Sequence, residues 1–365
     1  KRRATVTRTS ASTSGVAAKT RRASATRACA TSLASAALAL TPTPTNATLF
    51  SLGDNLVRGR FVCRPSARNK SPYVGDVQLE CGRIAVAHMP SMDMGGKCIP
   101  DAEVLLKVSV DSKTGKPVGS EAVGKFGTPK CEFSMQLLRC IEPENDHLPG
   151  GGGCWVGAHP QIGERVAHAL ISSGRLDAQL GGKAIQKIER EVTGVAGTDM
   201  RCDFLLTHTD SSKTVIEVKT VVDTDYDPKT APKRPGCVFV GRGDPYRRCA
   251  IFPWGKSNQV GPEGEKVVSA RAIKHIRELA KIALRKKHDV NCSRISAAIL
   301  FVVVRGDALA FRPNADACPS FARYLREARD AGVRILARQV RWGEESEGEE
   351  LGTAIDEGNL PIVLG

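Results

Sequence analysis

The chain has 365 residues and a formal net charge of +14, with 41% hydrophobic and 25% charged residues, which is typical of a globular protein. No apolar run approaches the roughly 20 residues that a membrane-spanning helix needs, so we expect no membrane partner. The twelve cysteines include no Cys-x-x-Cys pair and no Cys/His quartet at zinc spacing, which argues against structural zinc and favours reduced thiols.

Residues 1–48 are rich in Ala, Ser, Thr and Arg and contain no acidic residue. Eight of the 53 basic residues lie there, so the rest of the chain is only mildly basic. This composition is typical of an organelle transit peptide, and the Ser and Thr content favours the plastid (chloroplast) stroma, with a mitochondrial or cytoplasmic location as the alternative. A disordered basic tail describes the same residues equally well. In either case we expect residues 1–48 to be removable without loss of the fold.

Residues 49–130 alternate short apolar runs with turn residues. Several short strands without an obvious helix are typical of a small β-barrel or sandwich, and the strands are predicted at 55–64, 74–81, 83–88 and 103–110. Residues 143–153 include four consecutive glycines and predict a flexible connection or a long hairpin loop. A strand at 133–141 is predicted before this connection, and an amphipathic helix at 164–173 after it.

The next two predicted strands carry charged residues on an apolar background. Residues 201–206 (RCDFLL) and 214–220 (TVIEVKT) are joined by a polar turn, which predicts a β-hairpin. Because side chains alternate along a strand, Glu217 and Lys219 share one face, and Asp203 can lie beside Glu217 across the hairpin. Two adjacent carboxylates form a hard oxygen site for Mg²⁺ or Mn²⁺, and a neighbouring lysine can hold the water that attacks a phosphodiester. Such a match also occurs by chance, and the alternative is a surface salt bridge on a hairpin.

Residues 224–265 form a long basic excursion rich in Pro and Gly. Its basic and aromatic residues are those that single-stranded nucleic acid binding uses, although an insertion without a role fits as well. The remaining elements alternate in the manner of an α/β sheet, in the order helix 267–287, strand 297–304, helix 321–331 and strand 333–340. An acidic run at 344–350 predicts a solvated segment, and we expect residues 346–365 to form a C-terminal tail.

Several motifs, in the same order, resemble the sugar fermentation stimulation protein (SfsA) family over residues 56–364. The family's Arg-Ile-Asp-Phe-(Leu/Met)-Leu motif corresponds to residues 201–206, its Val/Ile-Glu-Val-Lys-x-Val-Thr motif to 216–222, and its Arg-Gly-x-Lys-His-Leu-Arg-Glu-Leu motif to 271–279. The family's His-Cys-Pro-Asn-Thr-Gly-(Ser/Ala)-Met motif stands here as the shorter His88-Met89-Pro90-Ser91-Met92-Asp93-Met94. A glutamate on the family's first helix is replaced by His168, with Glu164 one turn earlier.

This resemblance implies an α+β or α/β chain of two domains. An OB-like β-barrel at 49–130 would precede a PD-(D/E)XK nuclease-like domain at 131–345, with 224–265 as an insertion. The family is associated with DNA binding, which makes nucleic acid, and DNA in particular, the expected partner. The catalytic residues would be Asp203, Glu217 and Lys219, with the metal on the two carboxylates. The adjoining helix would contact nucleic acid through Arg271, Lys274, His275 and Arg277.

Two functions follow from these residues. One is a Mg²⁺-dependent nuclease, which the intact set of Asp203, Glu217 and Lys219 favours. The other is a non-catalytic nucleic-acid-binding regulatory protein with a relict nuclease site, which the replacement by His168 favours. A carbohydrate enzyme is a remote third, because the family name describes a phenotype and the sequence has no sugar-site signature.

Overall fold

The computed structural model describes residues 46–91, 94–125, 127–142, 152–233, 237–288 and 294–365. The chain divides into two units, Lys1–Thr41 and Pro42–Gly365, and every element described below belongs to the second. Up to residue 45 the predicted targeting tail lies outside the described residues, and so do residues 143–151 of the predicted connection. Within the described ranges, no helix is long and apolar enough to cross a membrane.

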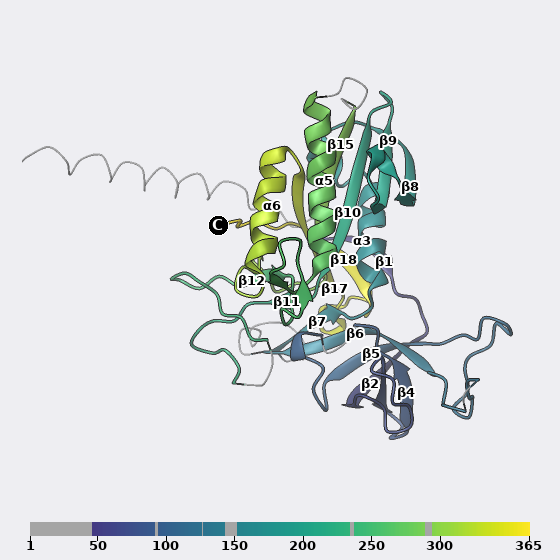
Figure 1. Ribbon diagram of the computed structural model, residues 1–365. Helices are drawn as coiled ribbons and strands as arrows, with labels where there is room; N and C mark the ends of the chain where they lie inside the picture. Colours follow the sequence, from purple (N-terminus) through teal and green to yellow (C-terminus); the bar gives the residue numbers. More distant parts are fainter. Residues whose placement is uncertain (1–45, 92–93, 126, 143–151, 234–236, 289–293) are drawn as a thin grey trace, which may run out of the picture. The chain divides into compact units, whose positions relative to one another are not determined.

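A seven-stranded mixed sheet carries the predicted hairpin (Figure 1). Its strands, in spatial order, are β1 (Ala47–Ser51), β18 (Thr353–Asn359), β17 (Arg334–Trp342), β15 (Ile295–Val303), β10 (Lys213–Val221), β9 (Arg201–His208) and β8 (Ile185–Thr193). The central strands β10, β15 and β17 run parallel, and the pairs toward both edges are antiparallel. β15 is the predicted central strand, and its apolar residues are buried, as expected where both faces of a sheet are covered.

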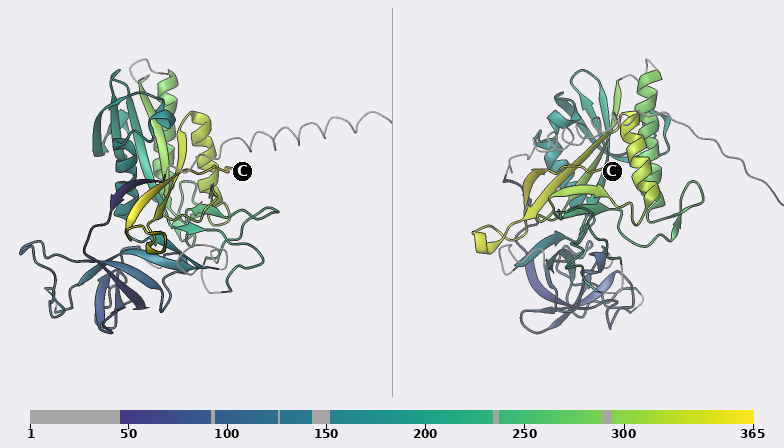
Figure 2. Two further views of the ribbon diagram at one scale, coloured as in Figure 1. Left: turned by 180° about the vertical axis from the view of Figure 1, so that it is seen from behind. Right: turned by 90° about the vertical axis from the view of Figure 1, so that its left-hand side faces the viewer.

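Helices cover both faces of this sheet. They are α3 (Gln161–Ser172), α4 (Asp177–Leu180), α5 (Ala270–His288) and α6 (Pro319–Ala331). α5 and α6 lie side by side on one face (Figures 1 and 2), where Ile276, Phe301 and Phe321 share one core. α3 and α4 belong to a second core that includes Leu170 and Leu300. Phe301 and Leu300 are neighbours on β15, so they face opposite sides of the sheet. The predicted mixed α/β class is confirmed.

The N-terminal strands form a separate six-stranded sheet. In spatial order they are β4 (Ile84–His88), β3 (Val74–Leu79), β2 (Leu56–Cys63), β5 (Glu103–Val108), β6 (Phe133–Ile141) and β7 (Gly153–Gly157). β4 also pairs in parallel with β6, through Ala87 with Phe133 and His88 with Ser134. All four strands predicted between residues 55 and 110 are present. Their inward side chains, such as Val77 and Leu106, form a third core.

The excursion at 224–265 contains more regular structure than its composition predicts. A three-stranded sheet consists of β11 (Asp223–Thr224), β12 (Cys249–Phe252) and β16 (Ala310–Pro313), and a hairpin consists of β13 (Gln259–Val260) and β14 (Lys266–Val267). β12 is short and apolar, and it gains a parallel partner in β16 from much later in the chain. Among the described residues the structure also has short turns of 3-10 helix: η1 (Met94–Gly96), η3 (Val195–Gly197) and η5 (Glu345–Glu347).

Three predicted boundaries differ from the structure. The N-terminal sheet continues past residue 130 into β6 and β7, which the prediction had assigned to the second domain. The predicted tail at 1–48 overlaps β1, and the predicted C-terminal tail at 346–365 contains β18. These strands pair with each other and extend the large sheet beyond β17. Phe50 of β1 packs edge-on against Trp342, with ring centroids 6.4 Å apart. Because the two strands come from opposite ends of the chain, their pairing leaves no local pattern in the sequence.

Candidate functional site

β9 and β10 form the predicted hairpin, and their pairing stops beside the candidate site. The antiparallel register ends at Ile216 opposite Phe204. Just beyond this pair, Oδ2 of Asp203 accepts a hydrogen bond from the backbone N–H of Val218 at 2.6 Å. The Asp203 carboxylate thus takes the place of a strand partner. It lies within electrostatic range of Glu217, as the alternation of side chains predicts.

Glu217 is almost fully buried, with 1% of its surface exposed, and its two carboxylate oxygens differ in their contacts. Oε1 accepts hydrogen bonds from Nζ of Lys219 and from Nδ1 of His275. Oε2 is buried and has no hydrogen-bond partner among the described residues. A buried carboxylate oxygen without a partner is costly, so Oε2 marks a position where a cation or a water would be stabilised.

The two carboxylates titrate apart. Burial and the charge of Glu217 raise the pKa of Asp203 to about 6, against the opposing effects of the Val218 N–H and the charge of Lys219. Burial acts to raise the pKa of Glu217 as well, but the hydrogen bond from His275 and the charge of Lys219 outweigh it and lower that pKa. Neighbouring carboxylates with separated pKa values are typical of acid–base and metal sites, although structural ion-pair networks also produce them.

Asp203 and Glu217 fit a hard divalent cation bound through two carboxylates. The part of the chain that the structure describes contains no group of three or more His, Cys, Asp or Glu side chains that could hold a metal ion. Mg²⁺ is usually held by one or two carboxylates, while water and substrate phosphates complete its coordination. The donor set therefore suits Mg²⁺ or Mn²⁺ and does not suit zinc, which takes three or four protein ligands.

Helix α3 brings a third carboxylate near the pair. The charge of Glu164 contributes to the raised pKa of Asp203, so these two groups lie within electrostatic range. Oε2 of Glu164 also accepts a hydrogen bond from Arg190 on the edge strand β8, at 3.1 Å. His168, one turn further along α3, packs against Phe204, with ring centroids 6.2 Å apart. Glu164 therefore supplies the acidic group on this helix, four positions before His168.

The four α5 residues predicted to contact nucleic acid separate into two groups. Arg271, Lys274 and Arg277 are exposed, and Lys274 forms an ion pair with Asp199 at 2.8 Å. His275 is only 7% exposed, and its Nδ1 contacts the candidate site instead of solvent. α5 therefore presents a basic face to solvent and a histidine to the carboxylates.

The excursion at 224–265 uses two of its aromatic residues for packing. Tyr226 is buried, and its hydroxyl donates a hydrogen bond to Glu142 at 2.6 Å. Phe252 packs against Phe301 and Phe321, with ring centroids 5.7 and 5.2 Å apart. These two rings are therefore not available to stack on bases. The composition of the excursion had suggested such stacking.

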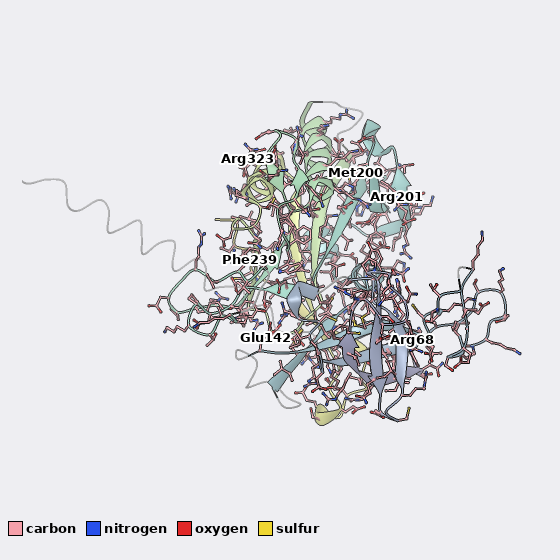
Figure 3. All side chains as sticks on the ribbon, turned by 60° about the horizontal axis from the view of Figure 1, so that its bottom comes forward. Arg68, Glu142, Met200, Arg201, Phe239 and Arg323 are labelled. Atoms are coloured by element: carbon pink, nitrogen blue, oxygen red, sulfur yellow. The ribbon has the colours of Figure 1, made fainter. Side chains whose placement is uncertain are left out.

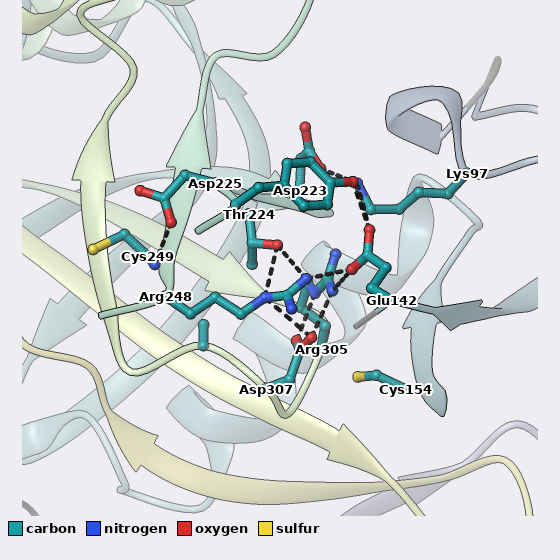
Figure 4. Close-up of polar contacts among 12 residues, drawn as sticks. Lys97, Glu142, Cys154, Asp223, Thr224, Asp225, Arg248, Cys249, Arg305 and Asp307 are labelled. Carbon is teal, nitrogen blue, oxygen red and sulfur yellow. Dashed lines mark hydrogen bonds and ion pairs between the residues drawn. The ribbon is translucent and has the colours of Figure 1, made fainter. Parts of the chain in front are cut away.

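A buried charge cluster, which no motif in the sequence indicated, lies beyond the end of β10 (Figure 4). Its side chains are each at most 8% exposed and come from five separate segments: Lys97, Glu142, Asp223, Arg248, Arg305 and Asp307. Glu142, which is labelled in Figure 3, comes directly after β6 in the sequence. It accepts hydrogen bonds from Arg248 and from Arg305, the latter at 2.9 Å. Three cations face three carboxylates, so the charges of this buried cluster balance.

Part of this cluster carries a signal in the sequence. Asp223 follows β10, and Arg305 and Asp307 follow β15, the parallel strand beside it. Charged residues directly after adjacent parallel strands meet at one edge of a sheet. Lys97 and Glu142 lie in segments whose local sequence gives no such indication.

The fold and the site together define a mixed α/β protein that carries two carboxylates and a lysine on a hairpin of its main sheet. A family model described as the sugar fermentation stimulation protein RE domain (SfsA) matches residues 266–346, which include His275 and lie outside the hairpin. A sugar fermentation stimulation protein homolog of Syntrophotalea carbinolica is 28% identical over 287 residues, or 78% of this chain and 90% of the relative. A homolog of Parasynechococcus marenigrum is 26% identical over 275 residues, or 74% of this chain and 83% of the relative.

A solved structure is also similar: SfsA of Pyrococcus furiosus in complex with Ca²⁺, with a TM-score of 0.55 and 19% identity. The match covers 87% of this chain and 99% of that one, and it shows a shared fold. Taken together, these similarities support the SfsA family for this chain.

Proposed function

We propose that this protein binds nucleic acid, with DNA as the expected partner, and cleaves phosphodiester bonds in a Mg²⁺-dependent reaction at Asp203, Glu217 and Lys219. The observation that carries the proposal is the carboxylate pair. Asp203 has a pKa raised to about 6, and Oε2 of Glu217 is buried without a partner among the described residues. A divalent cation between the two would relieve their repulsion and give Oε2 a partner. The Ca²⁺ in the Pyrococcus furiosus relative supports a divalent cation in this fold.

Each residue of the site has a distinct role in this proposal. Asp203 and Glu217 would hold Mg²⁺ or Mn²⁺. The metal would polarise the phosphodiester and lower the pKa of a bound water. Lys219 shares a strand face with Glu217, and its side chain is 15% exposed. Its ammonium therefore borders the site from the solvent side and would orient the attacking water.

Two further features support nucleic acid as the partner. Arg271, Lys274 and Arg277 form the exposed basic face of α5, and such residues contact phosphates. In the N-terminal sheet, the pairing of β4 with β6 connects strands that the order β4-β3-β2-β5-β6 would otherwise leave apart. This pairing supports an OB-like barrel, a fold whose strands and loops bind oligonucleotides.

The second candidate is a nucleic-acid-binding regulatory protein with a relict nuclease site. The resemblance places His168 where the family has a glutamate, and Glu164 is paired with Arg190. In addition, Oε1 of Glu217 is engaged by both Lys219 and His275, which leaves a single oxygen of that carboxylate for a metal. In this second candidate the fold and the basic face of α5 still bind nucleic acid, but the protein does not cleave phosphodiester bonds.

Incubation of the purified protein with labelled single- and double-stranded DNA and RNA separates these candidates. The nuclease predicts cleavage with Mg²⁺ or Mn²⁺, no cleavage with EDTA, and loss of cleavage in Asp203→Asn and Lys219→Met. Lys187→Ala, at an exposed position on β8, is the matched control and should cleave like the parent. Binding without cleavage in every metal would support the second candidate, and the absence of binding would contradict both.

The composition of residues 1–48 supports a plastid location as part of the same proposal. A fluorescent protein fused behind these residues should accumulate in the plastid stroma. Fluorescence that stays in the cytoplasm or enters mitochondria would overturn this assignment.

A further inference from the structure

Helix α5 carries a polar side chain into the core on the face that packs against the sheet. Its buried residues Ala272, Ile276 and Leu279 belong to the same core as the facing sheet residues. His275 lies among them along the helix and is 7% exposed. A buried imidazole needs a hydrogen-bond partner, and Nδ1 of His275 finds it in Oε1 of Glu217.

This hydrogen bond fixes which ring nitrogen carries the proton and which carboxylate oxygen remains available. The Glu217 carboxylate accepts in this contact, so Nδ1 of His275 is assigned as the donor. Nζ of Lys219 donates to the same oxygen. Both donors therefore engage Oε1, and Oε2 is left without a partner in the described part of the chain.

Of the two donors, His275 is the rigid one. The ammonium of Lys219 ends a flexible four-carbon stem and can turn toward another acceptor, such as a phosphate. His275 has two side-chain torsions and stands on a helix that is packed into the core. Its contact with Oε1 fixes the plane of the Glu217 carboxylate and, with it, the direction of Oε2.

We propose that His275 is a positioning residue that holds Glu217 so that Oε2 faces the cation. This inference rests on the proposed metal site and gives His275 a role other than contact with nucleic acid. Arg271, Lys274 and Arg277 on the exposed face of α5 supply that contact. Removing a hydrogen-bond partner of a metal ligand typically weakens metal binding about 10- to 100-fold.

Calorimetric titration of the full chain with Mn²⁺ tests this role without relying on activity. His275→Leu removes the donor and fills most of the space, whereas His275→Asn keeps an N–H near the position of Nδ1. We expect the Kd for Mn²⁺ to rise about 10- to 100-fold in His275→Leu and to stay close to the parent value in His275→Asn. Leu284→Ala, at an exposed position of the same helix, is the matched control and should bind Mn²⁺ like the parent. His275→Ala replaces the leucine variant if the latter does not fold.

Three outcomes would overturn the inference. Parent-like Mn²⁺ affinity in His275→Leu, with binding lost in Asp203→Asn, would remove the positioning role and leave the metal site standing. Equal losses in His275→Leu and His275→Asn would assign the effect to the imidazole ring and not to the donated hydrogen bond. A parent that binds no Mn²⁺ would remove the metal site and both proposals together. In EDTA, His275→Leu should bind nucleic acid like the parent, because a buried residue makes no phosphate contact.

Discussion

Lys97 and Asp223 form an ion pair in which each side chain is 2% exposed to solvent. Lys97 follows η1, and Asp223 begins β11, two positions after the strand that carries Glu217 and Lys219. Gly95 makes room for the pair: its φ is +74°, and a Cβ there would lie 2.9 Å from Nζ of Lys97. The pair thus ties a loop of the N-terminal sheet to the end of the strand that carries the candidate site.

Replacing Lys97 by Met should destabilise the protein strongly, because Asp223 would be left in a buried place without its partner. Breaking a buried ion pair from one side typically costs about 3–5 kcal/mol in the free energy of unfolding, which urea denaturation measures. The double variant Lys97→Met, Asp223→Asn should lose less than the single variant. Lys187→Ala, which removes an exposed lysine, should show no measurable loss, and a similar loss in both lysine variants would contradict the prediction.

Asp203 should make the stability of the protein depend on pH. Folding raises its pKa to about 6, so between about pH 4 and 6 the folded state holds a proton that the unfolded chain has lost. The contribution of this group to stability is therefore full below about pH 4 and is lost as the pH rises through 6. Asp203→Asn keeps an oxygen for the Val218 N–H and removes the charge. Above pH 7 this variant should be more stable than the parent by about 1–3 kcal/mol.

Urea denaturation in EDTA, between about pH 4 and 8, measures this difference. The two proteins should converge toward the acid end of the range. A difference that does not change with pH would show that the charge of Asp203 is not its source.

Truncation should separate dispensable from structural residues near the N-terminus. A chain that begins at Asn46 keeps β1 and should melt at the Tm of the parent. A chain that begins at Leu52 lacks β1 and its contact between Phe50 and Trp342, and it should melt at a clearly lower Tm. Phe50→Ala alone should cost about 2 kcal/mol, less than a fully buried Phe, because this ring is half-buried. Equal Tm values for both truncations would show that β1 contributes nothing.

Binding of nucleic acid should weaken steeply as salt rises, because phosphate contacts release bound counterions. Arg271→Ala, Lys274→Ala and Arg277→Ala should each weaken binding of all sequences alike and lower the salt slope by about 1. Fluorescence anisotropy between about 50 and 200 mM salt measures both quantities. Leu284→Ala on the same helix is the control. An affinity that salt leaves unchanged would contradict a phosphate-based interface.

The hairpin of the site could be predicted because it depends on local information. Alternation places Glu217 and Lys219 on one face, and the polar turn brings Asp203 across from them. The contact between His275 and Glu217 could not be predicted in this way, because it joins residues 58 positions apart through the packing of a helix on a strand. His275 does lie beside the apolar positions of α5, which is a sign of burial. The prediction that grouped it with the basic residues of the helix missed this sign.

The elements that the sequence did not reveal depend on distant partners. β1 and β18 stabilise each other from opposite ends of the chain, and each is too short to show a convincing pattern alone. Lys97 and Glu142 are charged residues of the kind usually found at the surface. Only the complete fold brings them together with Arg248 and Arg305. The same applies to the raised pKa of Asp203, whose main cause is burial.

Because Asp203 accepts a hydrogen bond from the Val218 N–H, the presence of an aspartate at this position is weak evidence that a related protein is catalytically active. Asp203 has a structural role besides its proposed role at the metal, because its carboxylate bonds a backbone N–H where the strand pairing stops. A related protein that had lost the nuclease activity would therefore still be expected to keep an Asp or Asn at this position. Oε2 of Glu217 has no structural partner among the described residues. A lineage without the chemistry would gain by replacing Glu217 together with His275, because the buried imidazole loses its acceptor when that carboxylate is removed. We therefore expect the residue at position 217, more than the residue at position 203, to differ between catalytically active and inactive proteins of the SfsA family.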